Sequence, residues 1–273
     1  MKILLTGVAG FIGYHLAEKL CALGHKVHGI DNIDNYYDVG LKYTRIKLLK
    51  KYKNFSFSQN NLNNLQELGD QKFDLAINFA AQAGVRLPNE LAYKYTESNV
   101  KGFSYFLNFC KSSNIEKIIY ASSSSVYSGL NKYPFSEDLD LEKPMSIYAQ
   151  TKIENEIMAE KYSVYNKSKI FGLRFFTVYG PYGRPDMAYY DFTKKIISNK
   201  DIIVFNDGEL LRDMTYVDDI VQGISGLIEN INGFNHGHEI FNLGNNKPEN
   251  LNKLISLIEE EFKKNAQIKY IFN

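Results

Sequence analysis

The first 31 residues are the part of the sequence that most limits the fold. Lys2–Thr6 is a short apolar run of the kind found in buried strands, and the pattern Gly7-x-x-Gly10-x-x-Gly13 follows it directly. Apolar residues on one face predict a helix over 11–23, and Lys26–Ile30 is a second strand-like run that ends at Asp31. Strand, glycine turn, helix and strand in this order predict a right-handed βαβ unit.

Each glycine of the pattern has a separate physical purpose. Gly7 permits a tight turn, Gly10 lets backbone amides approach a pyrophosphate, and Gly13 lets the helix pack close to the strand. The N-terminus of that helix attracts the anion. Asp31, which lies 18 residues after Gly13, is placed to accept hydrogen bonds from the adenosine ribose and would repel a 2′-phosphate. We therefore predict NAD rather than NADP. The alternative is a glycine-rich turn in another kind of α/β protein.

The rest of the chain alternates between strand-like and helical segments without an internal repeat. This pattern predicts an α/β fold of Rossmann type, with a doubly wound parallel sheet. We assign residues 1–177 to a cofactor-binding domain and 178–273 to a smaller substrate-binding lobe, with 239–244 returning to the main sheet. The expected strands are 55–57, 74–79, 116–122, 169–176 and 202–205, and the expected helices are 41–52, 91–113, 148–165, 191–198, 220–229 and 251–262.

Tyr148 and Lys152 are four residues apart in a predicted helix, so both side chains lie on one face and can point into one pocket. A tyrosine hydroxyl has a pKa near ~10 in water, and a fixed ammonium nearby favours the phenolate and makes it a better general base. The serine run 122–125 precedes this pair at the end of a predicted strand. The alternative is an ordinary pair on a helix surface, since the chain has 20 tyrosines.

Composition argues against several classes of function. The net charge of +1 indicates neither a nucleic-acid partner nor a membrane surface. Cys21 and Cys110 belong to no ligand-like cluster, which fits two buried residues in a reducing cytoplasm. His236 and His238 have no third candidate ligand near them in sequence, so no metal is expected.

Several motifs together resemble the extended short-chain dehydrogenase/reductase superfamily, and within it the nucleotide-sugar 4-epimerases, most specifically the UDP-glucuronate 4-epimerase group. The resemblance covers nearly the whole chain. The segment 183–187 (GRPDM) is the marker for uronate epimerases, whereas the other motifs indicate only the superfamily. Those other motifs are the glycine pattern, Asp31-Asn32, 80–86 (AAQAGVR), 121–127 (ASSSSVY), Tyr148-x-x-x-Lys152, 173–181 (LRFFTVYGP) and Arg212-Asp213.

The resemblance implies NAD as the cofactor, a UDP-sugar as the substrate and no metal. The implied catalytic residues are Ser123, with Ser124 as the second candidate, Tyr148 and Lys152. The implied cofactor contacts are Gly7, Gly10, Phe11, Ile12, Gly13, Asp31, Asn32, Asn61, Leu62, Phe79, Ala80, Ala81, Asn99, Ser122, Tyr148 and Lys152. The implied substrate contacts are Arg86, for which a solvated loop arginine is the alternative, and Ser124, Ser125, Thr177, Arg184 and Arg212.

The implied reaction is epimerisation at C4 of the sugar, from UDP-glucuronate to UDP-galacturonate. Tyr148 would remove the proton of the 4-hydroxyl while hydride leaves C4 for the nicotinamide, with Lys152 on the nicotinamide ribose and Ser123 on the reacting oxygen. The 4-keto sugar would then turn, and hydride would return to its opposite face. Related dehydratases and decarboxylases have an acid just after the catalytic hydroxyl. This chain has Ser124 and Ser125 there, which favours epimerisation.

A uronate adds a hazard, because its 4-keto form is a β-keto acid that loses CO2 when the carboxylate stands perpendicular to the carbonyl plane. The enzyme must therefore hold that carboxylate in an unproductive orientation. Ser125, Thr177 and Arg184 resemble the family positions that contact it. For each of them, a local hydrogen bond at a strand end is the alternative.

Family members continue beyond the equivalent of Phe272, so the resemblance implies a substrate lobe that is incomplete here. Arg212 would then hold the UDP diphosphate with less help, and 268–272 would begin a strand with an exposed edge. Three alternatives follow: an epimerase of another nucleotide sugar, an NAD-binding protein with little or no activity, or a lobe completed by a separate chain. The resemblance also implies a homodimer through the helices near 91–111 and 148–165.

Overall fold

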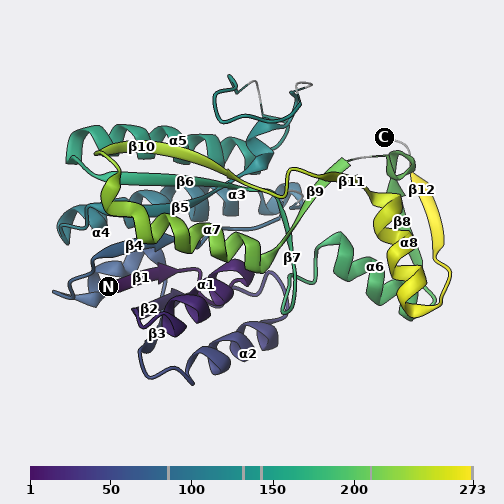
Figure 1. Ribbon diagram of the computed structural model, residues 1–273, viewed down its shortest axis with the longest axis horizontal. Helices are drawn as coiled ribbons and strands as arrows, with labels where there is room; N and C mark the ends of the chain where they lie inside the picture. The colour runs from purple at the N-terminus through teal and green to yellow at the C-terminus, as the bar shows by residue number, and fades with distance from the viewer. Residues whose placement is uncertain (85–86, 131–132, 142–143, 210, 272–273) are drawn as a thin grey trace.

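The computed structural model describes residues 1–84, 87–130, 133–141, 144–209 and 211–271. Its largest unit is a sheet of seven parallel strands in the spatial order β10-β6-β5-β4-β1-β2-β3 (Figure 1). The strand order reverses beside β1, as in doubly wound sheets, and the predicted Rossmann-type fold is confirmed. The strands are β1 (Lys2–Thr6), β2 (Lys26–Asp31), β3 (Phe55–Gln59), β4 (Leu75–Asn78), β5 (Lys117–Ser123), β6 (Lys169–Phe175) and β10 (Gly237–Leu243).

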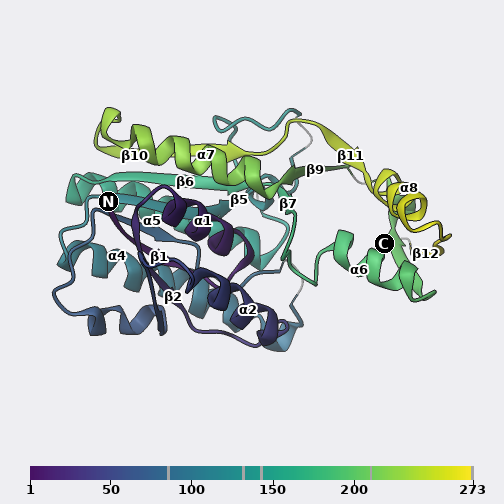
Figure 2. The same ribbon diagram turned by 60° about the horizontal axis from the view of Figure 1, so that its bottom comes forward.

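Helices cover both faces of this sheet (Figures 1 and 2). One face packs against α1 (Phe11–Ala22), α2 (Val39–Leu49) and α7 (Val217–Asn230), which share one apolar cluster with the strands. The other face packs against α4 (Gly102–Ser112) and α5 (Ile147–Asn166). Because both faces are covered, the central strands are continuous apolar runs rather than alternating ones.

A smaller lobe lies beside the carboxyl ends of the strands (Figure 1). It consists of α6 (Ala188–Ile197), β8 (Asp201–Phe205), α8 (Leu251–Phe262) and β12 (Gln267–Ile271), and it has its own apolar cluster. In it, β12 pairs in parallel with β8. A second small sheet joins the two units and contains β7 (Thr177–Tyr179), β9 (Leu211–Tyr216) and β11 (Pro248–Asn250). The chain crosses between the units more than once, since α7 and β10 follow residue 177 but pack with the large sheet.

The single long helix predicted over 91–113 is wrong, because the helical winding changes within it. A 3₁₀ turn, the one-turn helix α3 and a π-helical turn precede α4. Asn99 lies in the π-helical turn and bonds outward: its side-chain oxygen accepts from Gln82 N at 2.7 Å, and its carbonyl accepts from Asn155 Nδ2, also at 2.7 Å. A π turn frees such groups for bonds outside the helix. The three segments are Asn89–Leu91, Tyr93–Tyr95 and Thr96–Lys101, and the remaining 3₁₀ turns are Leu62–Leu68, Ser124–Tyr127, Asn206–Gly208 and Ile231–Gly233.

Candidate active site

A cleft of about 2380 Å³ opens between the carboxyl ends of the parallel strands and the smaller lobe. The glycine turn and the ends of β2, β4, β5 and β6 line one side, and Phe192, Ile203 and Leu254 line the other. Ligand pockets are commonly about 300–1,000 Å³, so this cleft has room for more than one ligand. Doubly wound proteins bind nucleotides at this edge of the sheet.

The glycine turn has no room for side chains where the chain packs most closely. Gly7 has φ +72°, and a Cβ on it would lie 2.5 Å from Ala80 N. A Cβ on Gly13 would lie 2.2 Å from the carbonyl oxygen of Gly7. The first turn of α1 is therefore pressed against the end of β1, and its residues line the cleft, where a helix N-terminus attracts an anion. This arrangement fits the pyrophosphate of a dinucleotide.

Asp31 lies at the end of β2 and lines the same cleft. Its side-chain oxygens accept hydrogen bonds from Ala9 N at 3.0 Å and from Ile33 N at 2.8 Å. Burial raises the pKa of the Asp31 carboxyl, while these two bonds and the positive charges of Lys42 and Arg45 oppose that shift. The carboxylate is thereby fixed next to the glycine turn, where an adenosine ribose would lie.

Two cations of α2 belong to this region, although nothing in the local sequence distinguishes them from helix-surface residues. Lys42 lines the cleft, and its ammonium donates to Asp34 O at 2.7 Å. Arg45 is fully buried, and its guanidinium donates to Ala9 O at 2.7 Å and to Tyr182 O at 2.6 Å. Arg45 therefore connects the glycine turn to the loop that carries Arg184.

Tyr148 and Lys152 lie on the face of α5 that meets the end of β5. Lys152 Nζ donates to Ala121 O at 2.8 Å and lies 5.7 Å from the centre of the Tyr148 ring. Ser123 is the last residue of β5, and its hydroxyl donates to Ser125 Oγ at 3.1 Å and lowers the pKa of the Tyr148 phenol. The hydroxyl of Ser123 also accepts from Ser125 N at 3.2 Å, which caps the following 3₁₀ turn. The fold thus brings together Ser123, Tyr148 and Lys152.

The electrostatics of this group follow from its burial. Burial raises the pKa of the Tyr148 phenol, whereas the Ser123 hydroxyl and the positive charge of Arg184 lower it. A positive charge from Arg184 therefore acts on Tyr148, whereas the sequence pattern predicted such a charge only from Lys152. Burial also lowers the pKa of Lys152 to about 8, and the negative charge of Glu156 opposes this shift.

Arg184 reaches the cleft from the loop after β7 and is held there by Asp186. Arg184 Nε donates to Asp186 Oδ1 at 3.0 Å, and Nη2 donates to Oδ2 at 2.5 Å. The Tyr36 hydroxyl donates to the same Oδ2 at 3.1 Å. Burial alone would raise the pKa of Asp186, but the hydrogen bonds and charge of Arg184 and the bond from Tyr36 lower it overall. Asp186 is therefore ionised and orients the guanidinium beside Tyr148.

The other residues singled out from the sequence divide into three groups. Asn99 does not line the cleft: it is 2% exposed and bonds to Gln82 and Thr151 behind it. Arg86 lies outside the described residues. All the remaining candidates line the cleft, namely Gly7, Gly10, Phe11, Ile12, Gly13, Asp31, Asn32, Asn61, Leu62, Phe79, Ala80, Ala81, Ser122, Ser123, Ser124, Ser125, Tyr148, Lys152, Thr177, Arg184 and Arg212.

A doubly wound sheet with this glycine turn, and a cleft large enough for a second ligand, is the architecture of a dinucleotide-dependent α/β protein. The chain belongs to the NAD dependent epimerase/dehydratase family, whose model matches residues 3–244. Its cofactor is accordingly NAD, and the resemblance to extended short-chain dehydrogenases/reductases is confirmed.

Individual relatives match nearly the whole chain. An uncharacterized protein of Methanocaldococcus jannaschii is 46% identical over 99% of this chain and 83% of that protein. A UDP-glucuronate 4-epimerase of Thermodesulfobacterium geofontis is 40% identical over 98% of this chain and 83% of that enzyme. The crystal structure of UDP-glucuronic acid 4-epimerase from Bacillus cereus in complex with UDP-glucuronic acid and NAD is 33% identical. It superposes with a TM-score of 0.91 over 100% of this chain and 87% of that one.

Two further observations concern membranes and metals. Within the described ranges, none of the helices has the length and apolar character required to cross a membrane. The same residues contain no group of three or more His, Cys, Asp or Glu side chains that could hold a metal ion. His238, one of the two histidines considered in the sequence, lies in β10, and its Nε2 is 2.8 Å from the Tyr120 hydroxyl.

Proposed function

We propose that this protein interconverts UDP-glucuronate and UDP-galacturonate by transient oxidation at C4. The observation that carries the proposal is that Ser123, Tyr148 and Arg184 line one cleft, where the hydroxyl of Ser123 and the charge of Arg184 act on the Tyr148 phenol. A phenol and a serine hydroxyl suit a reacting alcohol, and a guanidinium suits a carboxylate on the same sugar. The named relatives described above support the choice of a uronate.

Proton transfer is the task of the chain's own residues. Tyr148 accepts the proton of the 4-hydroxyl, and Ser123 hydrogen-bonds the same oxygen as it becomes a carbonyl. Lys152, while it remains an ammonium, adds a positive charge that favours the phenolate form of Tyr148, the form that accepts this proton and becomes the phenol. The chemistry supplied by NAD, when it is bound, is the reversible uptake of the C4 hydride. The glycine turn and Asp31 are the residues that would hold it, as the close packing at Gly13 indicates.

The uronate carboxylate is held, in this proposal, by residues just after the ends of β5 and β6 together with Arg184. Ser125 and Thr177 lie at the ends of neighbouring strands, and both line the cleft with Arg184. The two bonds to Asp186 use Nε and Nη2 of Arg184, which leaves Nη1 to point at a ligand. Residues 1–177 would then bind mainly NAD, and residues after 177 mainly the nucleotide sugar, with Arg212 at its diphosphate.

The first test is turnover by the purified protein. UDP-glucuronate should be converted to UDP-galacturonate without added reductant, because the hydride taken up at C4 is returned. The two epimers have the same mass, so they are separated by anion-exchange chromatography and identified by comparison with standards of each. UDP-glucose is the matched control, since it lacks only the carboxylate. Faster turnover of UDP-glucose would contradict the choice of a uronate, and tightly bound NAD without turnover of any nucleotide sugar would contradict the proposed reaction.

A second prediction concerns the carboxylate contact. Arg184→Met should lower kcat/KM for UDP-glucuronate by about 10- to 100-fold, because a hydrogen bond to a charged group contributes about 1.5–3 kcal/mol. The freed carboxylate should also allow loss of CO2 from the 4-keto sugar, which would appear as a UDP-pentose in the mass spectrum. Asp186→Asn, which keeps the guanidinium but weakens its orientation, should have a smaller effect in the same direction. If Arg184→Met has the same kinetics as the wild type, Arg184 does not contact the substrate.

A further inference from the structure

Three side chains on α5 lie in one row that faces the large sheet. Tyr148, Lys152 and Glu156 are each four residues apart, which stacks them on one face of the helix. Lys152 is 3% exposed and Glu156 is 7% exposed. The proton transfer proposed above uses the first two residues but not the third. A buried carboxylate is costly unless it is fully paired, so Glu156 requires an explanation of its own.

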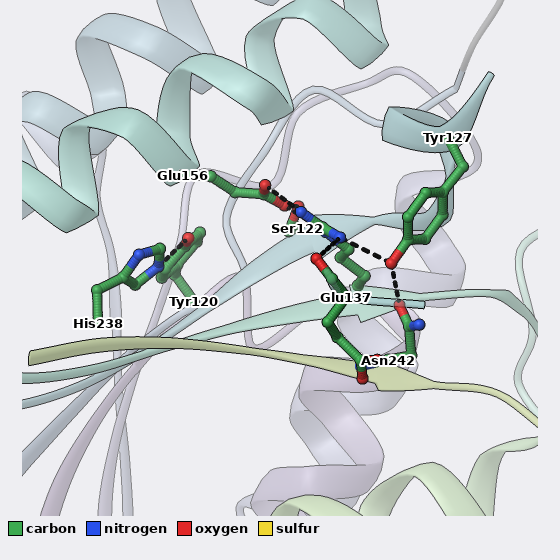
Figure 3. A network of polar contacts seen from close by, with 8 residues as sticks. Tyr120, Ser122, Tyr127, Glu137, Glu156, His238 and Asn242 are labelled. Atoms are coloured by element: carbon green, nitrogen blue, oxygen red, sulfur yellow. Dashed lines mark hydrogen bonds and ion pairs between the residues drawn. The ribbon is translucent and has the colours of Figure 1, made fainter. Parts of the chain in front are cut away.

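Glu156 is bound from two strands at once. Its Oε1 accepts from Ser122 Oγ at 2.5 Å and from Arg174 Nε at 2.9 Å, and its Oε2 accepts from Arg174 Nη2 at 2.8 Å. Arg174 is itself 4% exposed, and its Nη1 donates to the Tyr127 hydroxyl at 2.7 Å. Figure 3 shows Ser122 and Tyr127 on either side of this network, with Asn242 of β10 beyond Tyr127. One carboxylate therefore ties α5 to β5, to β6 and to the turn after β5.

The contacts of α5 fall on three consecutive residues at the end of β5. Lys152 bonds to the carbonyl of Ala121, Glu156 bonds to the hydroxyl of Ser122, and the hydroxyl of Ser123 lowers the pKa of the Tyr148 phenol. The middle contact is the one that also reaches a second strand, because Arg174 of β6 binds the same carboxylate. It therefore sets how closely the helix approaches the strand on which the other two contacts depend.

We propose that Glu156 is a positioning residue, held by Arg174, that fixes α5 against the end of β5 and keeps a negative charge one helical turn from Lys152. This inference rests on the roles proposed above for Tyr148 and Lys152. Glu156 touches neither substrate nor cofactor in this scheme. It acts through Lys152, whose ammonium it favours, and through Ser122, which immediately precedes Ser123.

The other charged and titratable groups around Glu156 do not replace this charge. Arg174 of β6 is a cation, so it cannot favour the ammonium of Lys152. Burial raises the pKa of Tyr120 on β5 well above its ordinary value, and burial lowers the pKa of His238 on β10. Both side chains are therefore neutral near pH 7. Burial lowers the pKa of Lys152 to about 8, and Glu156 is the neighbour that opposes this shift.

The first experiment needs no substrate. A lysine whose pKa is lower in the folded state than in the unfolded state makes the free energy of unfolding rise with pH between those two values. For Lys152 this rise begins at a pH of about 8, which is the pKa of the residue in the folded protein. In Glu156→Gln the rise should begin about one pH unit lower, because the neighbouring negative charge is gone. Urea unfolding between about pH 6.5 and 8 should therefore show a steeper rise in Glu156→Gln than in wild type. The same comparison in a Lys152→Met background should show no difference in slope.

The second experiment follows the rate. The decline of kcat on the alkaline side should move by about one unit to lower pH in Glu156→Gln, with KM for UDP-glucuronate changed less than kcat. Glu160→Gln is the matched control, because Glu160 lies on the same helix with its side chain 57% exposed. It should retain the wild-type pH profile. Loss of stability alone would lower the amount of active enzyme without moving the profile.

If Glu156→Gln does not fold, Glu156→Gln/Arg174→Gln removes both members of the pair and leaves no buried charge unpaired. The double variant should be folded and still show the shifted unfolding slope and pH profile. The inference is overturned if the variant that folds has the same unfolding slope with pH and the same pH profile of kcat as the wild type. If no nucleotide sugar is turned over while the unfolding slopes differ as expected, the proposed function fails and the effect of Glu156 on Lys152 stands.

Discussion

Replacing Tyr148 with phenylalanine is expected to lower kcat for C4 epimerisation of UDP-glucuronate by about 100- to 10,000-fold, the range that a positioned general acid–base group contributes. The substitution removes only the hydroxyl that Ser123 and Arg184 act upon and keeps the ring that packs on Tyr95. The fold and the content of bound NAD should therefore be unchanged. Initial rates, together with absorbance of the nucleotide released on denaturation, measure both effects.

Tyr165→Phe provides the matched control for this prediction. Tyr165 lies on the same helix, but its side chain is 83% exposed and points away from the packed core. The same chemical change at this position should leave the rate within experimental error of wild type. A Tyr148→Phe variant that retains full activity would require another base for the 4-hydroxyl and would sink the proposed mechanism.

Gly13→Ala is expected to abolish tight binding of NAD and to destabilise the fold by about 1–3 kcal/mol, the usual cost of overpacking. The added methyl group would lie 2.2 Å from the Gly7 carbonyl oxygen and 2.9 Å from the Gly7 carbonyl carbon. Both atoms belong to the backbone of the turn, so the helix and the strand end must separate. Nucleotide content after purification and the free energy of unfolding in urea test the two parts of this prediction.

Gly226→Ala is the control for Gly13→Ala, because Gly226 also lies inside a helix. A Cβ there would meet nothing within 4 Å, and replacing an interior helix glycine by alanine is expected to stabilise by about 0.5–1 kcal/mol. The two substitutions should therefore change stability in opposite directions. Unchanged NAD content in Gly13→Ala would mean that the close approach of α1 to β1 is not needed for the cofactor.

The sequence was most informative where the structure depends on the spacing of residues that are close together in the chain. The glycine pattern, the acid at the end of β2 and the alternation of apolar runs with amphipathic segments predicted the sheet and its cofactor edge, because each depends on residues close together in the chain. The prediction for 91–113 was wrong because Asn99 bonds to Gln82 and Asn155, which are distant in sequence. Strand β9 was not anticipated either. Its residues are mostly exposed or partly exposed, and pairing with β7 and β11 defines it.

By itself, the sequence determined the α/β class, the glycine turn and the Tyr148–Lys152 pair, since helical and strand periodicities fix which neighbouring side chains share a face. Only the tertiary structure decided which charges surround that pair. Arg184 and Glu156 come from different parts of the chain, and their partners Asp186, Arg174 and Ser122 lie 2, 18 and 34 residues away. Electrostatic interactions depend on distance in space and on burial, and neither can be read from separation along the sequence.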